Sequence, residues 1–124
     1  MNTLYQELIL DHYRNPRNHG TLTKLTHRAT ALNVSCGDKL QMDIRVKNGI
    51  IGEVKFSGVG CAISQASASL LTECVKNRSA AEALSLEPTD VLALLGVTLS
   101  PGRIKCGLLS LETLKKALGT PEIK

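Results

Sequence analysis

The segment around Asn48-Gly49 limits the possible folds of this chain more than any other part of the sequence. Before it, apolar and polar residues alternate over residues 40–46, and after it a second, largely apolar segment covers residues 50–56. Alternation is the pattern of a half-buried strand, and Asn-Gly is the strongest short signal for a hairpin turn. With an earlier strand near residues 29–34, these segments predict a small antiparallel sheet with one face covered.

Helical patterns account for most of the remaining chain. Pro16 ends the first of them, because proline disfavours a helical residue before it, and Pro101 suits the first turn of the last. The expected helices cover residues 3–14, 62–76, 80–84, 89–95 and 101–118. No linker or repeat divides the sequence, so we expect one domain over residues 1–124. The predicted class is α+β, with a three-stranded antiparallel sheet packed with helices.

The charge of the chain is mildly basic. The formal net charge is +4, and the lysines and arginines are scattered along the sequence. Nucleic-acid-binding proteins usually show a clustered basic face, often with stacking aromatic residues. This chain has only two tyrosines and one phenylalanine, so the sequence argues against nucleic-acid binding. A mildly basic surface can still attract an acidic protein partner.

The first residues show no cationic region followed by an apolar one, and the longest apolar stretches are too short to span a bilayer. We therefore expect no membrane partner and a cytoplasmic location. In that compartment, scattered cysteines more often bind metal or react than form disulfides. The sequence has no C-x-x-C, which argues against a thioredoxin-type redox pair and a simple zinc ribbon.

Three of the four cysteines lie at breaks between the periodic segments, beside glycine, a carboxylate or a cation. Such surroundings expose a thiol and favour its thiolate. These cysteines are Cys36, Cys61 and Cys106. Arg103 and Lys105 are expected to stabilise the Cys106 thiolate by their charge. Cys74 differs, because it lies inside an apolar helical segment, where cysteine is usually a small buried hydrophobic residue.

An aspartate completes a possible set of ligands. Asp38 lies two residues after Cys36, so both side chains point to one side if the loop continues the line of the strand. Three thiolates and one carboxylate, from Cys36, Asp38, Cys61 and Cys106, can hold zinc tetrahedrally or bind an iron–sulfur cluster. The three cysteines are far apart in the sequence, so a shared site and separate roles both remain open at this point.

Four motifs, in order along the chain, resemble those of the U-type iron–sulfur cluster scaffold proteins, the family of the NifU N-terminal domain, IscU and SufU. The motifs are LDHYRNPRN at residues 10–18, CGD at 36–38, GVGCAIS at 58–64 and RIKC at 103–106. The resemblance extends over nearly the whole chain. It implies a SufE/NifU-like fold, in agreement with the sheet and helices expected above.

The resemblance also implies a function and a site. Members of this family accept sulfur from a cysteine desulfurase, build a [2Fe-2S] cluster and pass it to recipient apo iron–sulfur proteins. The ligands implied by the motifs are Cys36, Asp38, Cys61 and Cys106, and the same site can instead hold Zn²⁺. Cys106 and Cys36 are the candidate sulfur-accepting thiolates.

Two departures from the family pattern leave alternatives open. Lys105 stands where many members have histidine, and in this it resembles SufU-like proteins. The insertion that SufU-like proteins usually carry between the second and third cysteine motifs is missing. The alternatives are a zinc-bound sulfurtransferase that relays persulfide sulfur without building a cluster, and a structural zinc module that only binds a partner. Residues 99–103 (LSPGR) replace the Leu-Pro-Pro-Val-Lys type segment that a dedicated chaperone recognises, which leaves an Hsp70-type partner open.

Overall fold

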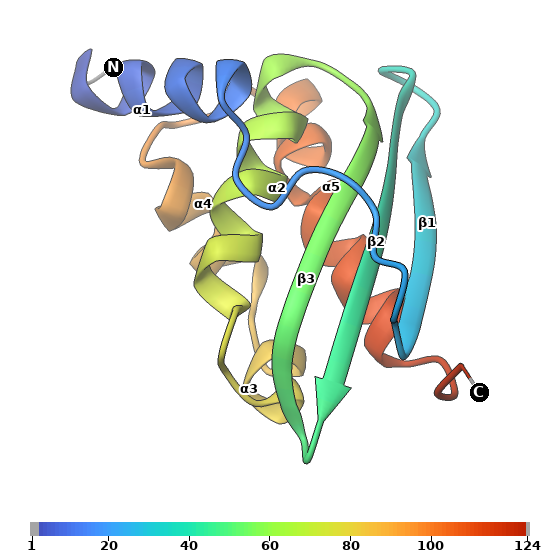
Figure 1. The fold of residues 1–124 in the computed structure, drawn as a ribbon. Coiled ribbons are helices and arrows are strands. Elements are labelled where there is room, and N and C mark those ends of the chain that lie inside the picture. Colours follow the sequence, from blue (N-terminus) through green and yellow to red (C-terminus); the bar gives the residue numbers. More distant parts are fainter. Residues whose placement is uncertain (1–2, 124) are drawn as a thin grey trace.

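A sheet and a group of helices lie against each other, with α2 and α5 packed on one face of the sheet (Figure 1). In this computed structural model, which describes residues 3–123, one sheet is three-stranded. The strands are β1 (His27–Asn33), β2 (Asp38–Lys47) and β3 (Ile50–Val59). The helices are α1 (Thr3–Arg14), α2 (Ala62–Val75), α3 (Ala80–Leu84), α4 (Pro88–Leu95) and α5 (Pro101–Leu118). The predicted α+β class and three-stranded antiparallel sheet are confirmed.

The predicted hairpin turn joins β2 to β3. Asn48 and Gly49 have φ angles of 55° and 77°, so both take the left-handed conformation that a two-residue type I′ turn requires. Beside the turn, Lys47 pairs with Ile50. The turn therefore sets the register in which the apolar residues of the two strands share one face.

At the end of the sheet far from this hairpin, three chain segments meet. β1 ends with Asn33 opposite Asp38, the first residue of β2. On the other side of β2, Lys39 pairs with Val59 at the end of β3. The turn before β2 and the connection from β3 to α2 therefore leave the sheet at the same end.

The covered face of the sheet is aliphatic. Leu40, Met42 and Ile44 alternate along β2 without exposed surface and belong to the clusters formed with α2 and α5. Phe56 of β3 adds an aromatic ring to this core. None of the helices within residues 3–123 combines the length and the apolar character needed to cross a membrane.

Small side chains allow α2 and α5 to pack closely. Ser67 on α2 donates a hydrogen bond to the Gly107 carbonyl at 2.6 Å, and its hydroxyl lies 2.8 Å from the hydroxyl of Ser110. These contacts satisfy buried hydroxyl groups and fix the position of α5 along α2. Cys106 precedes the bonded glycine, so its position depends on the same contact.

The LDHYRNPRN motif fastens α1 to α2. His12 is buried, and its Nδ1 lies 2.7 Å from Ser69 Oγ on α2. The Arg17 backbone N–H donates to the same hydroxyl at 2.9 Å, and the Arg17 guanidinium pairs with Asp11 at 2.7 Å. Burial, together with the Arg17 charge, lowers the pKa of His12, so the ring is neutral at pH 7. His12 therefore contributes to the packing of α1 on α2.

Asp43 on β2 has a buried carboxylate that accepts several hydrogen bonds. It accepts from Arg28 Nε at 2.7 Å, from Arg28 Nη2 at 3.0 Å and from the Leu22 backbone N–H at 3.0 Å. Burial acts to raise the pKa of Asp43, but the hydrogen bonds and the Arg28 charge outweigh it and hold this pKa below its usual range. The interaction ties β1 and the preceding connection to β2.

We predict that Asp43→Asn lowers the free energy of unfolding by about 2 kcal/mol near neutral pH, because Arg28 and the Leu22 backbone N–H lose a buried, charged acceptor. A carboxyl with a lowered pKa stabilises the fold above its unfolded pKa of about 3.9 and loses this contribution as the pH falls through the folded value. In urea titrations the difference between parent and variant should therefore shrink as the pH is lowered below about 4.

Glu53→Ala is the matched control for this experiment. It removes the Arg45–Glu53 pair, whose side chains are 41% and 53% exposed, and should change the free energy of unfolding by less than about 0.5 kcal/mol. A difference between Asp43→Asn and the parent that stays the same at every pH would contradict the assigned role of the Asp43 charge.

Candidate metal centre

Four residues predicted as ligands lie at the end of the sheet where the three segments meet. Cys36 lies in the turn between β1 and β2, and Asp38 begins β2. Cys61 is the N-cap residue of α2, and Cys106 lies in the second turn of α5. The fold therefore brings side chains from distant parts of the chain into one region.

Three of these residues form a compact group. Cys106 Sγ lies 3.0 Å from Cys36 Sγ, and these sulfurs and a carboxylate oxygen of Asp38 all lie within 4.8 Å of one another. The sequence predicted that Cys36 and Asp38 lie along one extended strand, and this prediction is wrong. Residues 34–37 form a turn instead, in which Gly37 has a φ of +72°, and the turn folds the Cys36 thiol back toward α5.

Cys61 lies beside this group. Its backbone N–H donates to Asp38 Oδ1 at 3.0 Å, and its sulfur lies 3.9 Å from Ser64 Oγ. Cys61 is not part of the group of Cys36, Asp38 and Cys106, whose ligand atoms all lie within 4.8 Å of one another, but its thiol contributes to the raised pKa of Cys106. The structure therefore places Cys61 at the edge of the centre, with its backbone already holding one oxygen of Asp38.

The second carboxylate oxygen of Asp38 is placed to bind a cation. Asp38 is 2% exposed, and its Oδ2 is buried without a hydrogen-bond partner among residues 3–123. Burial of an unpaired carboxylate oxygen is costly, and a cation beside it would remove that cost. Zinc and iron–sulfur clusters both accept thiolate ligands with a carboxylate. The donors present therefore fit either a zinc ion or an iron–sulfur cluster.

The surroundings of the three thiols differ more than the sequence predicted. Cys36 is exposed and Cys61 is half-buried, but Cys106, which was expected to be an exposed thiolate, is fully buried. Burial, followed by Cys36, Asp38 and Cys61, raises the pKa of Cys106. Burial also acts to raise the pKa of Cys61, but hydrogen bonds from Ser64 lower it overall.

A buried thiol of this kind is not excluded as a ligand. A metal cation supplies positive charge where Cys106 has acidic and thiol neighbours, and it favours the thiolate as ligand. Loss of that proton is thus linked to metal binding rather than to the isolated protein. The expectation of a free Cys106 thiolate was wrong because the buried side of α5 was not identified.

Arg103 and Lys105 are exposed residues of α5. Burial and the neighbouring side chains of Cys36, Asp38 and Cys61 have the largest effects on the pKa of Cys106, and neither Arg103 nor Lys105 is among them. Lys105 lines a groove between α5 and the end of β1. Their role in stabilising a thiolate stays a prediction.

Two residues of the site were missed in the sequence. Asn33 is buried, and its Nδ2 lies 3.6 Å from Cys106 Sγ, as a weak donor to that sulfur. Gly60 lets two polar groups approach each other, because a side chain there would meet Ser64 Oγ and, at 2.8 Å, Asp38 Oδ1. The position of Asn33 at the end of a predicted strand gave no chemical signal, whereas Gly60 immediately before Cys61 was a hint of close packing.

We predict that Gly60→Ala weakens zinc binding by about tenfold, because the added methyl group would displace Asp38. Changes to residues around metal ligands typically lower metal affinity by about 10- to 100-fold. Competition with a chelating dye measures this affinity. Gly102→Ala is the matched control, because a methyl group there meets nothing within 4 Å. Equal zinc affinity for Gly60→Ala and Gly102→Ala would show that the packing of Gly60 against Asp38 is unimportant for the site.

Comparison with known proteins gives a consistent result. Residues 4–123 match the family model described as NifU-like N terminal domain. The sequence is 35% identical to the zinc-dependent sulfurtransferase SufU of Bacillus subtilis, over 98% of this chain and 94% of that protein. It is 37% identical to the iron-sulfur cluster assembly scaffold protein IscU of Thermotoga maritima, over 93% of this chain and 92% of that protein.

The alignment with SufU extends over 139 positions, more than the 124 residues of this chain, so SufU contains residues without a counterpart here. Among solved structures, FiSufU of Fervidobacterium islandicum AW-1 is similar with a TM-score of 0.78 and 29% identity. The match covers 90% of this chain and 94% of that one. The NifU-like fold implied by the motifs is confirmed by this similarity.

Proposed function

Because this chain belongs to the NifU-like N-terminal domain family, we propose that it is an iron–sulfur cluster assembly scaffold. It accepts sulfur from a cysteine desulfurase, combines the sulfur with iron in a [2Fe-2S] cluster and passes the cluster to recipient apo proteins. The observation that carries this proposal is the meeting of Cys36, Asp38 and Cys106, beside an oxygen of Asp38 that has no partner within residues 3–123. Cys61 is the fourth proposed ligand.

Sulfur enters the site by thiol exchange. A thiolate of this chain attacks the outer sulfur of the desulfurase persulfide, so that a new S–S bond forms on the attacking cysteine. The S–S bond on the desulfurase breaks, and its cysteine leaves as a thiolate. Cys36 is exposed and Cys106 lies 3.0 Å from it, so sulfur accepted by one can pass to the other. Each transferred sulfur then takes two electrons from an external reductant to become sulfide.

The test is anaerobic reconstitution of the purified chain with ferrous iron, cysteine, a reductant and a cysteine desulfurase. We expect a brown protein with visible absorption, and transfer of that absorption to an added apo [2Fe-2S] ferredoxin. A chain that stays colourless while the desulfurase produces sulfide would exclude the scaffold function.

A zinc-dependent sulfurtransferase is the second candidate. It is favoured by the similarity to SufU and by Lys105, which stands where many family members have histidine and where SufU-like proteins have lysine. In this function Zn²⁺ would hold the thiolates deprotonated and ordered, and one of them would leave the metal to accept sulfur. Zinc-loaded chain would then accelerate desulfurase turnover without iron, whereas a scaffold would require iron to form its product.

We also propose a cytoplasmic location. Cys36, Cys61 and Cys106 are free thiols in the structure, and their proposed chemistry requires that they stay reduced. The cytosol maintains thiols in that state. Alkylation of whole cells and of separated fractions, followed by mass analysis of the Cys36 peptide, measures both the location and the redox state.

A further inference from the structure

The sheet has two outer edges, and the edge of β3 is covered at both ends. Phe56 exchanges backbone hydrogen bonds with the segment of residues 18–20, and Ile51 exchanges them with the segment of residues 77–78. Covered edges cannot pair with another chain, and this is how folded proteins avoid unwanted strand pairing. The edge of β1 is different.

β1 is covered only along part of its length. The Thr26 carbonyl, just before the strand, accepts from the Ile123 backbone N–H at 2.7 Å, and the Thr30 carbonyl accepts from Lys116 Nζ at 2.8 Å. In an antiparallel ladder, residues bonded to the neighbouring strand alternate with residues whose N–H and C=O point away from it. Leu32, two residues after Thr30, therefore presents both groups outward, and residues 3–123 provide no partner for them.

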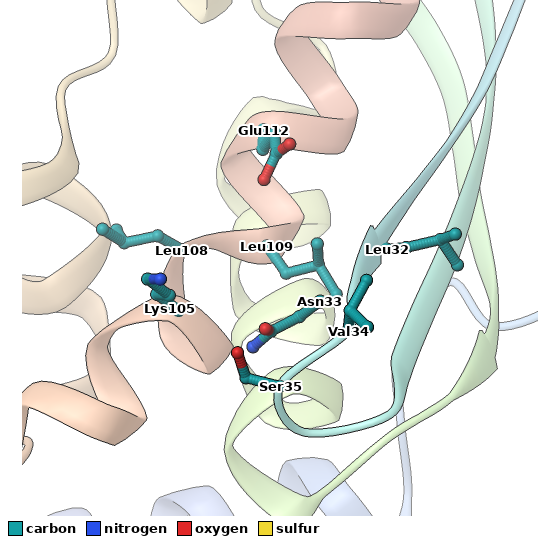
Figure 2. Close-up of a pocket in the computed structure, with 8 residues that line it drawn as sticks. All are labelled: Leu32, Asn33, Val34, Ser35, Lys105, Leu108, Leu109 and Glu112. Atoms are coloured by element: carbon teal, nitrogen blue, oxygen red, sulfur yellow. The ribbon is translucent and has the colours of Figure 1, made fainter.

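A groove follows this open part of the edge. A hollow of about 430 Å³ lies between the end of β1 and α5, and residues of both elements, among them Asn33, Lys105 and Glu112, line it (Figure 2). A second hollow of about 640 Å³ shares Leu32 and Glu112 with the first, so the two form one continuous groove. The side chain of Leu32 is 59% exposed and that of Val34, in the next turn, is 88% exposed.

The strand side of the groove is mixed, with exposed Leu32 and Val34 beside Thr30, Asn33 and Lys39, and the helix side carries two cations. Lys105 and Lys116 of α5 line it against a single acidic side chain, Glu112. Side chains of an added strand would alternate between the outer face, beside Leu32, and the helix side. An apolar residue suits the first position and an acidic residue suits the second.

We propose that the free edge of β1 binds an extended, acidic peptide segment of a partner protein, which adds a short fourth strand beside Leu32, between the Thr30 carbonyl bonded to Lys116 and the turn of residues 34–37. Backbone pairing at Leu32 supplies affinity, and the alternating side chains supply selectivity. The edge ends at the turn that carries Cys36, so the bound segment would lie next to the candidate metal centre. The proposal does not depend on cluster assembly, because peptide binding can be measured on the metal-free chain.

The test uses a capped six-residue peptide of alternating valine and glutamate, with the ¹⁵N-labelled full chain. We expect shift changes along β1 and hydrogen exchange of the Leu32 amide slowed by about tenfold on saturation. The same peptide with N-methylated valines keeps its side chains and charge, but its valines, which lie opposite Leu32, can no longer donate backbone hydrogen bonds. Its affinity should be lower by about tenfold, the value of one or two hydrogen bonds.

Variants of the chain separate backbone pairing from charge. Leu32→Pro removes the outward N–H, a change that an edge strand tolerates, and should weaken binding by about fivefold. Lys105→Gln should weaken it by about threefold, whereas Lys47→Gln, with the same change of charge beside the hairpin turn, should have no effect. Equal binding of both peptides would overturn the proposal. If, without peptide, hydrogen exchange of the Leu32 amide slowed as the chain concentration increased, the proposal would also be overturned, because a second copy of the chain would then occupy the edge.

Discussion

Cys106→Ala is expected to abolish assembly of the [2Fe-2S] cluster and to lower zinc affinity by more than about 100-fold, since loss of an outer-sphere partner alone costs 10- to 100-fold. Cys106 is the buried thiol of the group, with its sulfur 3.0 Å from Cys36 Sγ and 3.6 Å from Asn33 Nδ2. No nearby side chain within residues 3–123 can replace its sulfur. Visible absorption after reconstitution and a zinc competition assay measure the two effects.

The matched control is Cys74→Ala. Cys74 was predicted to be a core residue, but it is only half-buried and lines a separate hollow of about 250 Å³ with Leu71 and Val91. This substitution also removes one thiol from a helix, but outside the metal centre. It should leave cluster yield unchanged. If Cys106→Ala formed as much cluster as Cys74→Ala, the ligand set proposed here would be wrong.

Asp38→Ala is expected to produce a cluster that persists about tenfold longer in the presence of an apo acceptor. Asp38 would be the hard oxygen ligand among soft thiolates, and iron–sulfur centres favour thiolates, so its bond to the cluster is the weakest. A weak ligand provides the position at which a recipient thiol can enter. The decay of visible absorption under a fixed concentration of reductant and acceptor measures the lifetime.

Asp38 has a second role that the experiment must separate, because its Oδ1 accepts from the Cys61 N–H. Asp38→Asn keeps an oxygen acceptor for that N–H but removes the charge that binds metal. Both variants should lengthen the cluster lifetime if Asp38 acts as the labile ligand. A change confined to Asp38→Ala would instead assign the effect to a displaced Cys61. Asp11→Ala, in the exposed Asp11–Arg17 pair, controls for loss of an acidic residue elsewhere.

Local chemistry explains which parts of the fold could be predicted. The Asn48-Gly49 turn and Pro101 at the start of α5 depend on neighbouring residues, and both are present in the structure. β3 is longer than expected and continues to Val59, because its last residues pair with β2. Such an extension depends on a partner strand and is invisible in local periodicity.

The metal centre could be predicted only in part. The spacing of the cysteines gave no reason for Cys36 and Cys106 to meet, and the ordered motifs supplied the expectation. The burial of Cys106 did have a signal in the sequence. It shares one side of α5 with Leu109, Thr113 and Ala117, all buried, at the spacing of an amphipathic helix.

The distribution of the donors along the chain has a consequence for synthesis in the cell. Cys36 and Cys106 are separated by 70 positions, and the later one lies on the last helix. A ribosome releases Cys36 and Cys61 well before α5 is synthesised. A partial set of ligands binds a cation more weakly than the complete set. Because the proposed ligand set is complete only after α5 has been synthesised and has docked, we expect a growing chain to bind metal more weakly than the finished fold.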